Sequence, residues 1–469
     1  MPENDTSYRH LRERYPEFCY EGFRHAVLSD GLHIEFDFRM GEVAFHPTAV
    51  VERRPFLHFD VEDLDAIVFN IGMVELVSYW KCSCSPRVKV RCGKLDDGQI
   101  AFWRKLYWHG LGEFFYTNGI AADADDFMAI ETDGPIRVPE NPVGGDKGYL
   151  VPIGGGKDSV VTLELLRKAG CEVRPLVMNP RGATEACARV AGFPIDQVLV
   201  VRRTIDPTLL QLNKMGYLNG HTPFSAMLAF YTLLCSALSG VGSVALSNEW
   251  SANESTVLGS SVNHQYSKSL EFEDDFRRYC ANLFVSASGA TTPATDATTH
   301  SHIHAFNYFS FLRPLSELQI ARLFSRFPAY HEVFRSCNVG SKQDLWCCHC
   351  AKCLFAYIIL SPFIPPRRLR QLFGADLLND LSLEKEMRQL LGMEENKPFE
   401  CVGTVEEVRI ALSMAMDLYY QTEVPRLLCK VDFVPVHYDD ASFSKVARRG
   451  NLNELEYTIL QEACLEKIS

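Results

Sequence analysis

The segment YLVPIGGGKDS at residues 149–159 begins with a short hydrophobic run. It continues with three consecutive glycines, a lysine, an aspartate and a serine. Because glycines lack a Cβ, successive backbone N–H groups can converge on an anion in such a loop. A helix that starts directly after the loop adds positive potential at the same place. The segment therefore predicts a phosphate-binding loop at residues 154–159; a glycine turn without a ligand is the alternative for an isolated loop of this kind.

Two common phosphate loops do not match this segment. A Walker A loop requires a glycine five positions before the Gly-Lys pair and a Ser or Thr after the lysine, and Val151 and Asp158 occupy these positions. A Rossmann fingerprint requires Gly or Ala where Ser159 stands and an acidic residue at the end of the second strand, where Asn179 stands. Neither of these two loops therefore describes the segment, and the glycine turn without a ligand stays an alternative.

Four cysteines form a second group with chemical potential. Their spacing is C-x₉-C-x₂-C-x₂-C, and they are Cys337, Cys347, Cys350 and Cys353. Two overlapping C-x₂-C steps bring sulfur atoms together, and a closed set of four thiolates favours a structural Zn²⁺. An iron–sulfur cluster is a competing interpretation, and unligated buried thiols are a third. Cys348 and His349 are further candidate ligands.

The segments around the glycine loop alternate between strand and helix patterns. Strands are predicted at residues 149–153, 172–179, 197–202 and 243–247, and helices at 159–169, 182–193 and 224–238. Alternation at this spacing is typical of an α/β protein with a doubly wound parallel sheet. Ligands of such sheets bind beyond the carboxyl ends of the strands.

The chain of 469 residues is too long for one ordinary core. The segment PENPVGGDKG at residues 139–148 is rich in Pro and Gly and marks a boundary. We expect an N-terminal α+β domain at residues 1–145, an α/β domain at 146–330, and a mostly helical C-terminal region at 331–469 that carries the cysteine cluster. The small and polar segment 286–304 is predicted to be a long loop.

The charge balance excludes some partners. The formal net charge is −12, which argues against a large nucleic-acid interface because such an interface needs a basic surface. The N-terminus is charged and lacks the apolar core of a signal peptide, and no apolar run is long enough to cross a bilayer. Sixteen cysteines without an export signal suggest reduced thiols. We therefore expect a cytoplasmic protein that binds neither nucleic acid nor a membrane.

The order Gly-Gly-Gly-Lys-Asp-Ser resembles the pyrophosphate loop, commonly S-G-G-x-D-S, of the N-type ATP pyrophosphatases, whose fold is that of the adenine nucleotide alpha hydrolases. Gly154 stands where that family usually has serine, which removes one hydroxyl donor. The resemblance implies that ATP is cleaved to AMP and pyrophosphate, with Asp158 as a Mg²⁺ ligand. It further implies that the loop contacts pyrophosphate through Gly154, Gly155, Gly156, Lys157 and Ser159. The end of the second strand, at Met178 and Asn179, would contact adenine.

Further segments extend a resemblance over most of the chain. They are GMVELVSYWKCSC (72–84), GLGEFFYTNGI (110–120), SNEWSANES (247–255), VNHQYSKSLEFE (262–273), SFLRPLSELQIA (310–321) and FECVGTVEE (399–407). In this order, with the loop and the cysteines, they resemble the bacterial UDP-N-acetylmuramoyl-L-alanyl-L-glutamate epimerases. The resemblance implies conversion of the terminal L-Glu of UDP-MurNAc-L-Ala-L-Glu to D-Glu in peptidoglycan precursor synthesis. It implies this UDP-linked muramoyl dipeptide as substrate and the ligase that adds L-Glu as a partner.

Adenylation has a physical reason in this chemistry. Removal of the α-proton beside a free carboxylate would build a second negative charge on an anionic group, and adenylation removes the first charge. His264 is then a candidate acid or base, Lys268 a candidate ligand of a carboxylate or phosphate, and Tyr266 a hydrogen-bond donor. Glu249 follows the fourth predicted strand, on the side where ligands bind. The identity of the base stays open, and each of these side chains has a purely structural alternative.

Two other functions are compatible with these motifs. One is a different pyrophosphate-loop enzyme that adenylates a purine or a tRNA, similar to the 7-cyano-7-deazaguanine synthases, in which a similar cysteine cluster holds zinc. The acidic net charge disfavours tRNA. The other is a non-catalytic ATP-binding module, against which the intact Asp158 and Ser159 count.

Overall fold

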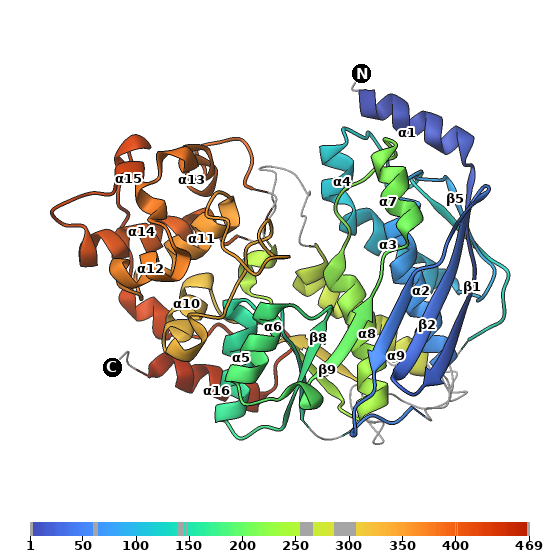
Figure 1. Cartoon of the computed structure of the whole chain (residues 1–469), viewed down its shortest axis with the longest axis horizontal. Coiled ribbons are helices and arrows are strands. Elements are labelled where there is room, and N and C mark those ends of the chain that lie inside the picture. Colours follow the sequence, from blue (N-terminus) through green and yellow to red (C-terminus); the bar gives the residue numbers. More distant parts are fainter. Residues whose placement is uncertain are drawn as a thin grey trace. The chain divides into compact units, whose positions relative to one another are not determined.

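A computed structural model of the whole chain (Figure 1) describes residues 3–59, 64–137, 145, 148–253, 266–285, 306–398, 400 and 402–466. The chain forms two compact units, each assembled from three separate stretches. Unit 1 contains Met1–Leu150, Leu199–Val244 and His264–Tyr308, and unit 2 contains Val151–Val198, Ala245–Asn263 and Phe309–Ser469. The division at residues 145 and 330 that the sequence suggests stays a prediction.

Unit 1 is built on a mixed sheet. Its strands are β1 (Glu17–Leu28), β2 (Gly31–Met40), β3 (Val43–Phe45), β4 (Thr48–Glu52), β5 (Arg87–Val90), β6 (Ala129–Thr132) and β9 (Leu199–Arg203). They are neighbours in the order β9-β4-β2-β1-β5-β6, with β3 beside β2. Strand β1 runs antiparallel to β2 and parallel to β5. The long strands β1 and β2 are blue in Figure 1. Strand β2 alternates as its sequence predicts, with Leu32, Ile34 and Phe36 buried on one face.

The helices of unit 1 include one that is buried on nearly every side. The helices are α1 (Glu3–Arg14), α2 (Leu64–Trp80), α3 (Asp97–Gly110), α4 (Gly112–Thr117), α7 (Pro207–Lys214), α8 (Phe224–Ser239) and α9 (Leu270–Val285), and Tyr266–Lys268 forms a 3₁₀ turn. Helix α2 is buried around its circumference and packs against α8 and β1. Trp80 at its end is fully buried and donates its indole N–H to the Ser85 carbonyl, so Trp80 is a core residue.

Unit 2 contains the strand–loop–helix segment that the glycine sequence predicts. Its helices are α5 (Lys157–Lys168), α6 (Gly182–Val190), α10 (Glu317–Ser325), α11 (Ala351–Leu360), α12 (Pro366–Phe373), α13 (Glu384–Leu390), α14 (Val405–Tyr419), α15 (Arg426–Lys430) and α16 (Glu454–Leu465). Strand β8 (Val173–Met178) lies in this unit, and the boundary between the units falls within β7 (Tyr149–Pro152), β10 (Ser243–Leu246) and β11 (Asn307–Ser310). These strands follow one another in the order β11-β10-β7-β8.

Most predicted elements around the loop are present within a few residues of their expected ends. Strands β7 and β10 are parallel, as the alternating pattern predicts. Strand β9 is also present, but its partner β4 runs antiparallel to it, with Ala49 opposite Arg203 and Val51 opposite Val201. The expected parallel arrangement therefore does not extend from β9 to its neighbour β4. The partner strand lies about 150 positions earlier in the chain, and periodicity within a short window does not reveal such long-range pairing.

The C-terminal part of unit 2 is helical, as expected. Helix α11 is buried at every position except Lys352 and packs against α12, α13 and α14, which are drawn near it in Figure 1. Among the described residues, no helix combines the length and hydrophobicity that a membrane crossing requires. The mixed α/β architecture is confirmed, and the assignment to the ATP pyrophosphatase fold stays a prediction.

Candidate functional site

The glycine loop joins the end of β7 to the start of α5. The Ile153 N–H donates to the Leu176 carbonyl at 2.8 Å, which anchors the loop to β8. Gly155 has φ +84°, a left-handed conformation that favours glycine. A Cβ on Gly155 would lie 3.0 Å from Ala183 Cβ, whereas a Cβ on Gly154 would meet nothing within 4 Å. The loop is therefore closely packed at Gly155 and open at Gly154.

The first turn of α5 has the character of an anion site. Its N-cap is Gly156, so no side chain caps this end of the helix. The neighbouring helix α6 differs, because its first amides at Gly182 and Ala183 donate to the Asp344 carboxylate at 2.9 and 3.0 Å. Uncapped amides at a helix N-terminus attract phosphate through hydrogen bonds and the helix dipole. The residues present therefore fit the phosphates of a nucleotide at α5.

Lys157 lies between two carboxylates. Its ammonium group contacts Asp158 Oδ1 and Glu317 Oε2, and the exposed fractions of the three side chains are 7% for Lys157, 31% for Asp158 and 3% for Glu317. Burial by itself would lower the pKa of Lys157, but attraction by Asp158 and Glu317 outweighs it and raises the pKa, so the ammonium stays charged. Asp158 is the most exposed of the three groups and could hold Mg²⁺.

Glu317 is fixed by two helix N-termini. It is the first residue of α10, after the N-cap Ser316, and its backbone N–H donates to Glu407 Oε1 at 2.7 Å. Glu407 Oε2 in turn accepts from the Thr404 N–H at 2.8 Å, which caps α14. Burial raises the pKa of Glu317. The charges of Asp158 and Glu249 raise this pKa further, and the charge of Lys157 opposes them. The quoted segments 310–321 and 399–407 thus both contribute to the surroundings of the loop.

Ser159, Met178 and Asn179 lie near the same end of the strands. The Ser159 hydroxyl is buried and donates to the Gly156 carbonyl at 3.1 Å, so it stabilises the loop. Met178 is the last residue of β8 and is half-buried. Asn179 follows it, exposed and with φ +50°. Both positions are at the carboxyl end of β8, where an adenine contact is expected.

Glu249 follows β10 in unit 2. Its side chain is buried and accepts a hydrogen bond from the Ser251 hydroxyl at 3.0 Å. The fully buried Arg313 donates to the Glu249 carbonyl at 2.8 Å, which fixes the backbone at this point. A buried carboxylate held by a hydroxyl and beside an ordered backbone is suited to a chemical role, and it is equally suited to a structural one.

The other catalytic candidates belong to unit 1. His264 lies outside the described residues. Tyr266 is buried, with its hydroxyl 3.4 Å from Asp275 Oδ2 and its ring beside the ring of His109. Burial, followed by the charges of Asp275 and Glu271, raises the pKa of Tyr266. Lys268, half-buried, ends the same 3₁₀ turn.

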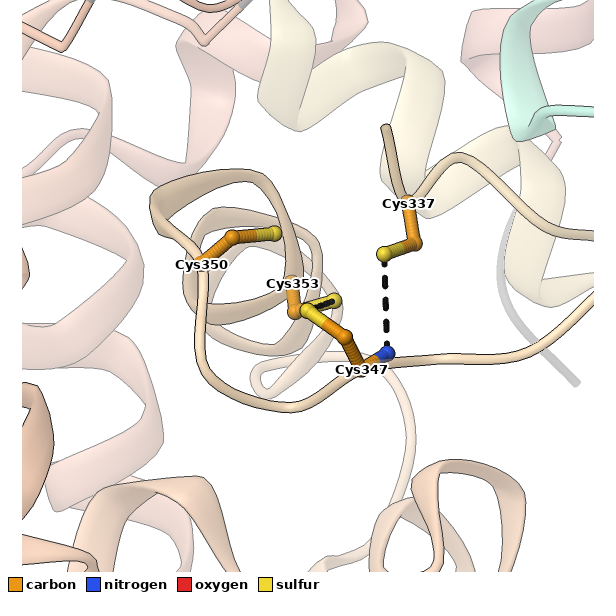
Figure 2. A group of neighbouring side chains, drawn as sticks. All are labelled: Cys337, Cys347, Cys350 and Cys353. Atoms are coloured by element: carbon orange, nitrogen blue, oxygen red, sulfur yellow. Dashed lines mark hydrogen bonds between the residues drawn. The ribbon is translucent and has the colours of Figure 1, made fainter. Parts of the chain in front are cut away.

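The four cysteines of the C-terminal region converge (Figure 2). The sulfur atoms of Cys337, Cys347, Cys350 and Cys353 all lie within 4.8 Å of one another, and those of Cys347 and Cys353 are 3.7 Å apart. Backbone N–H groups of Gly340 and Cys347 point to the Cys337 sulfur at 3.1 and 3.5 Å. Four sulfurs at about 2.3 Å from one Zn²⁺ would be about 3.8 Å from each other. The cluster could therefore hold a structural metal ion.

The two spare ligand candidates do not join this group. Cys348 has φ +60°, and its sulfur lies 3.2 Å from the carbonyl oxygen of Phe373. His349 is exposed, and its backbone N–H rather than its ring approaches the Cys347 sulfur at 3.5 Å. The left-handed backbone at Cys348 separates these side chains from the four converging thiols.

Three residues around the loop were missed by sequence reasoning. Asp344 caps α6, Glu317 pairs with Lys157, and Glu407 holds the Glu317 amide. The only signals in the sequence are the cap patterns Ser316-x-x-Gln319 and Thr404-x-x-Glu407, which predict helix starts. Neither pattern says that these helix starts lie against the loop.

Comparisons with known proteins agree with this arrangement of motifs. Residues 9–289 match the family model described as the MurL N-terminal domain, and residues 333–431 match the MurL C-terminal domain. A UDP-N-acetyl-alpha-D-muramoyl-L-alanyl-L-glutamate epimerase of Salinispora tropica is 36% identical over 384 residues, covering 80% of this chain and 78% of the relative. A protein with the same name from Xanthomonas oryzae pv. oryzae is 35% identical over 353 residues, or 73% of each chain.

These matches extend over both units and include the glycine loop, the candidate residues that follow β10, and the cysteine cluster. Identity at this level over most of both chains is sufficient to assign the family. The chain belongs to the family of UDP-N-acetyl-alpha-D-muramoyl-L-alanyl-L-glutamate epimerases.

Proposed function

We propose that the protein inverts the terminal L-glutamate of UDP-MurNAc-L-Ala-L-Glu to D-glutamate and that it consumes ATP, releasing AMP and pyrophosphate through an acyl-adenylate. The observation that carries the proposal is the 36% identity over 80% of the chain to a relative named for this epimerase activity. The glycine loop supports the ATP part. The ligase that adds the L-glutamate is the partner proposed to deliver the substrate.

The loop residues are assigned to the nucleotide. The uncapped amides of Gly156 and the first turn of α5, with Ser159, would hold the β- and γ-phosphates. Asp158, partly exposed, would contact the Mg²⁺ that neutralises phosphate charge. Met178 and Asn179 would face the adenine. Transfer of the adenylyl group to the glutamate carboxylate breaks the α–β phosphate bond and releases pyrophosphate.

Adenylation prepares the α-carbon for proton removal. The free carboxylate is anionic, whereas the carboxyl group in its mixed anhydride with AMP carries no charge, so the neighbouring C–H becomes acidic enough for a side-chain base. A raised pKa keeps Tyr266 protonated, which suits it to donate a hydrogen bond or a proton rather than to accept one. His264, Lys268 and Glu249 are the proposed acid–base and charge-stabilising groups. Hydrolysis of the mixed anhydride by water then yields the D-glutamyl product and AMP.

The cysteine cluster is proposed to hold Zn²⁺ in a structural role. All four tetrahedral positions would be occupied by thiolates, so no position would remain for a substrate. The cluster would join the segment around Cys337 to the start of α11 and so stabilise the surroundings of α10, which packs against α11.

Product analysis tests the proposal. The purified protein is incubated with Mg²⁺, ATP and UDP-MurNAc-L-Ala-L-Glu, and nucleotides and glutamate configuration are determined by chromatography. We expect AMP and pyrophosphate, and D-glutamate in the hydrolysed product. UDP-MurNAc-L-Ala, which lacks the glutamate, serves as the control and should release no AMP. Formation of ADP, or inversion without ATP, would contradict the adenylation mechanism.

A further inference from the structure

The loop lysine is directed into the protein. Lys157 is the first residue of α5, and its side chain is only 7% exposed. Its ammonium group contacts two carboxylates at once, those of Asp158 and Glu317. Two of the three ammonium protons are therefore committed to carboxylates, and a direct phosphate contact could use only the third.

Glu317 is anchored through its backbone and the cap of its helix. Its backbone amide donates to Glu407, and Ser316 caps the helix that starts with it. Its own side chain is 3% exposed, so water cannot replace Lys157 as a partner. A buried carboxylate without a counter-charge is strongly unfavourable. Glu317 therefore holds Lys157 in a defined position.

Charge balance decides how available Asp158 is for a cation. The Lys157 ammonium contacts both carboxyl groups, so Asp158 does not have to neutralise it alone. If Lys157 faced Asp158 alone, the two would form a neutral pair and attract a divalent cation less. The second carboxylate satisfies the lysine and leaves the negative charge of Asp158 available.

We propose that Glu317 and Lys157 are positioning residues for the ATP site: Glu317 holds the Lys157 ammonium, and the ammonium orients the Asp158 carboxylate at the start of α5 for Mg²⁺. The inference rests on the proposed function, because it takes Asp158 as a contact of the Mg²⁺ that accompanies ATP. It differs from the sequence-based expectation that Lys157 contacts pyrophosphate.

Two experiments test the pair: calorimetric titration of ATP at a series of Mg²⁺ concentrations, and thermal unfolding. Both are applied to three variants, which are Glu317→Gln, Lys157→Met and the double variant. Glu317→Gln keeps the shape and removes one charge, so we expect the Mg²⁺ concentration for half-maximal ATP binding to rise about tenfold, the effect of one charge at short range. The double variant Lys157→Met with Glu317→Gln keeps the charge of Asp158 but lacks the ammonium that orients it. Its Mg²⁺ requirement should therefore stay at least about threefold above that of the wild type, while ATP binding should be normal at saturating Mg²⁺.

Thermal unfolding measures the pair without ATP. Lys157→Met leaves Glu317 buried without its counter-charge and should lower the melting temperature by on the order of 5 °C or more. Glu317→Gln leaves Lys157 with Asp158 as its remaining partner and should lower the melting temperature less. The double variant should lose less than the sum of the two single variants, because the charges are removed together. If the loss in melting temperature of the double variant equals the sum of the losses of the two single variants, the pairing is wrong.

Glu164→Gln is the matched control. Glu164 lies on the same helix, is buried, and pairs with Arg167 at 2.9 Å and with Tyr330. This variant should lower the melting temperature without changing the Mg²⁺ requirement.

Three outcomes would overturn the inference. If Glu317→Gln shows the Mg²⁺ dependence of the wild type, and the wild type binds ATP normally, then Glu317 does not position the site, and the proposed function is unaffected. A double variant that binds ATP as weakly as Lys157→Met at saturating Mg²⁺ would show that Lys157 contacts the phosphates directly. Failure of the wild type to bind ATP at any Mg²⁺ concentration would overturn the proposed function as well.

Discussion

The sulfur atoms of Cys347 and Cys353 lie 3.7 Å apart, close to the distance of about 3.8 Å between two ligands of one tetrahedral zinc ion. Cys337 and Cys350 complete a group in which all sulfur atoms are within 4.8 Å of one another. Two of the four enter from the loop before α11 and one from its first turn, while Cys337 comes from upstream. This convergence from separate positions leads to the first prediction.

Elemental analysis of the purified protein should find about one zinc ion per chain. Cys353→Ser should lose the zinc and lower the melting temperature by at least ~5 °C, because metal binding contributes directly to folding. Cys429→Ser is the control, since Cys429 is exposed and outside the cluster, and it should retain both zinc and stability. Iron in place of zinc would contradict the choice of metal, and absence of both metals would contradict the site.

The two glycines that begin the loop should differ sharply in their tolerance of a side chain. Gly155→Ala places a Cβ at φ +84° and 3.0 Å from Ala183 Cβ, so we expect a loss of about 1–2 kcal/mol in the free energy of unfolding from backbone strain alone. ATP affinity should fall at least ~10-fold because the amides move. Gly154→Ser faces open space and should change stability by less than ~0.5 kcal/mol while adding a hydroxyl donor. Denaturant unfolding and ATP titration of both variants measure these effects, and equal behaviour of the two would contradict the described loop.

Removal of the Asp158 charge should abolish nucleotide chemistry and leave the fold intact. We expect Asp158→Asn to reduce AMP formation at least ~100-fold, because Mg²⁺ and phosphate positioning provide most of the catalysis in phosphate chemistry. The exposed Asp196, in the same unit, provides the control variant Asp196→Asn, which should retain full activity. AMP release by Asp158→Asn at the wild-type rate would place the nucleotide elsewhere.

Lys81 should give the stability of the protein a specific pH dependence. Burial, followed by the charge of Arg203, lowers the pKa of Lys81 to about 8 from 10.5, although its ammonium donates to the Gly220 carbonyl and the Thr222 hydroxyl. Between these two pH values the unfolded chain binds more protons at Lys81 than the folded chain does. The free energy of unfolding should therefore rise with pH relative to Lys81→Met, by at most about 1.4 kcal/mol per pH unit.

Denaturant unfolding of the wild type and of Lys81→Met at several pH values from about 7 to about 10 measures this difference. Burial raises the pKa of Cys82 to about 12 from 9.0, so this thiol ionises in the range only in the unfolded chain; it is present in both proteins, and its contribution cancels in the difference. A constant difference across this range would show that Lys81 has an ordinary pKa.

Local sequence patterns predicted the elements around the loop, since a buried strand, a glycine turn and a helix leave strong signals at short range. The spacing of the cysteines predicted their convergence for the same reason. Long-range relationships left no such signal. The pairing of β4 with β9, and the contact of Glu317 with Lys157, join residues about 150 and 160 positions apart. His264 lies outside the described residues, so its role stays a prediction.

The most direct test of the central claim is the exchange of the glutamate α-proton with solvent. UDP-MurNAc-L-Ala-L-Glu is incubated with the protein, ATP and Mg²⁺ in deuterated water, and the product is examined by mass spectrometry and NMR. The account predicts deuterium at the α-carbon of the D-glutamate, formed together with AMP and absent when ATP is omitted. D-glutamate that retains the original hydrogen, or exchange that proceeds without ATP, would contradict it.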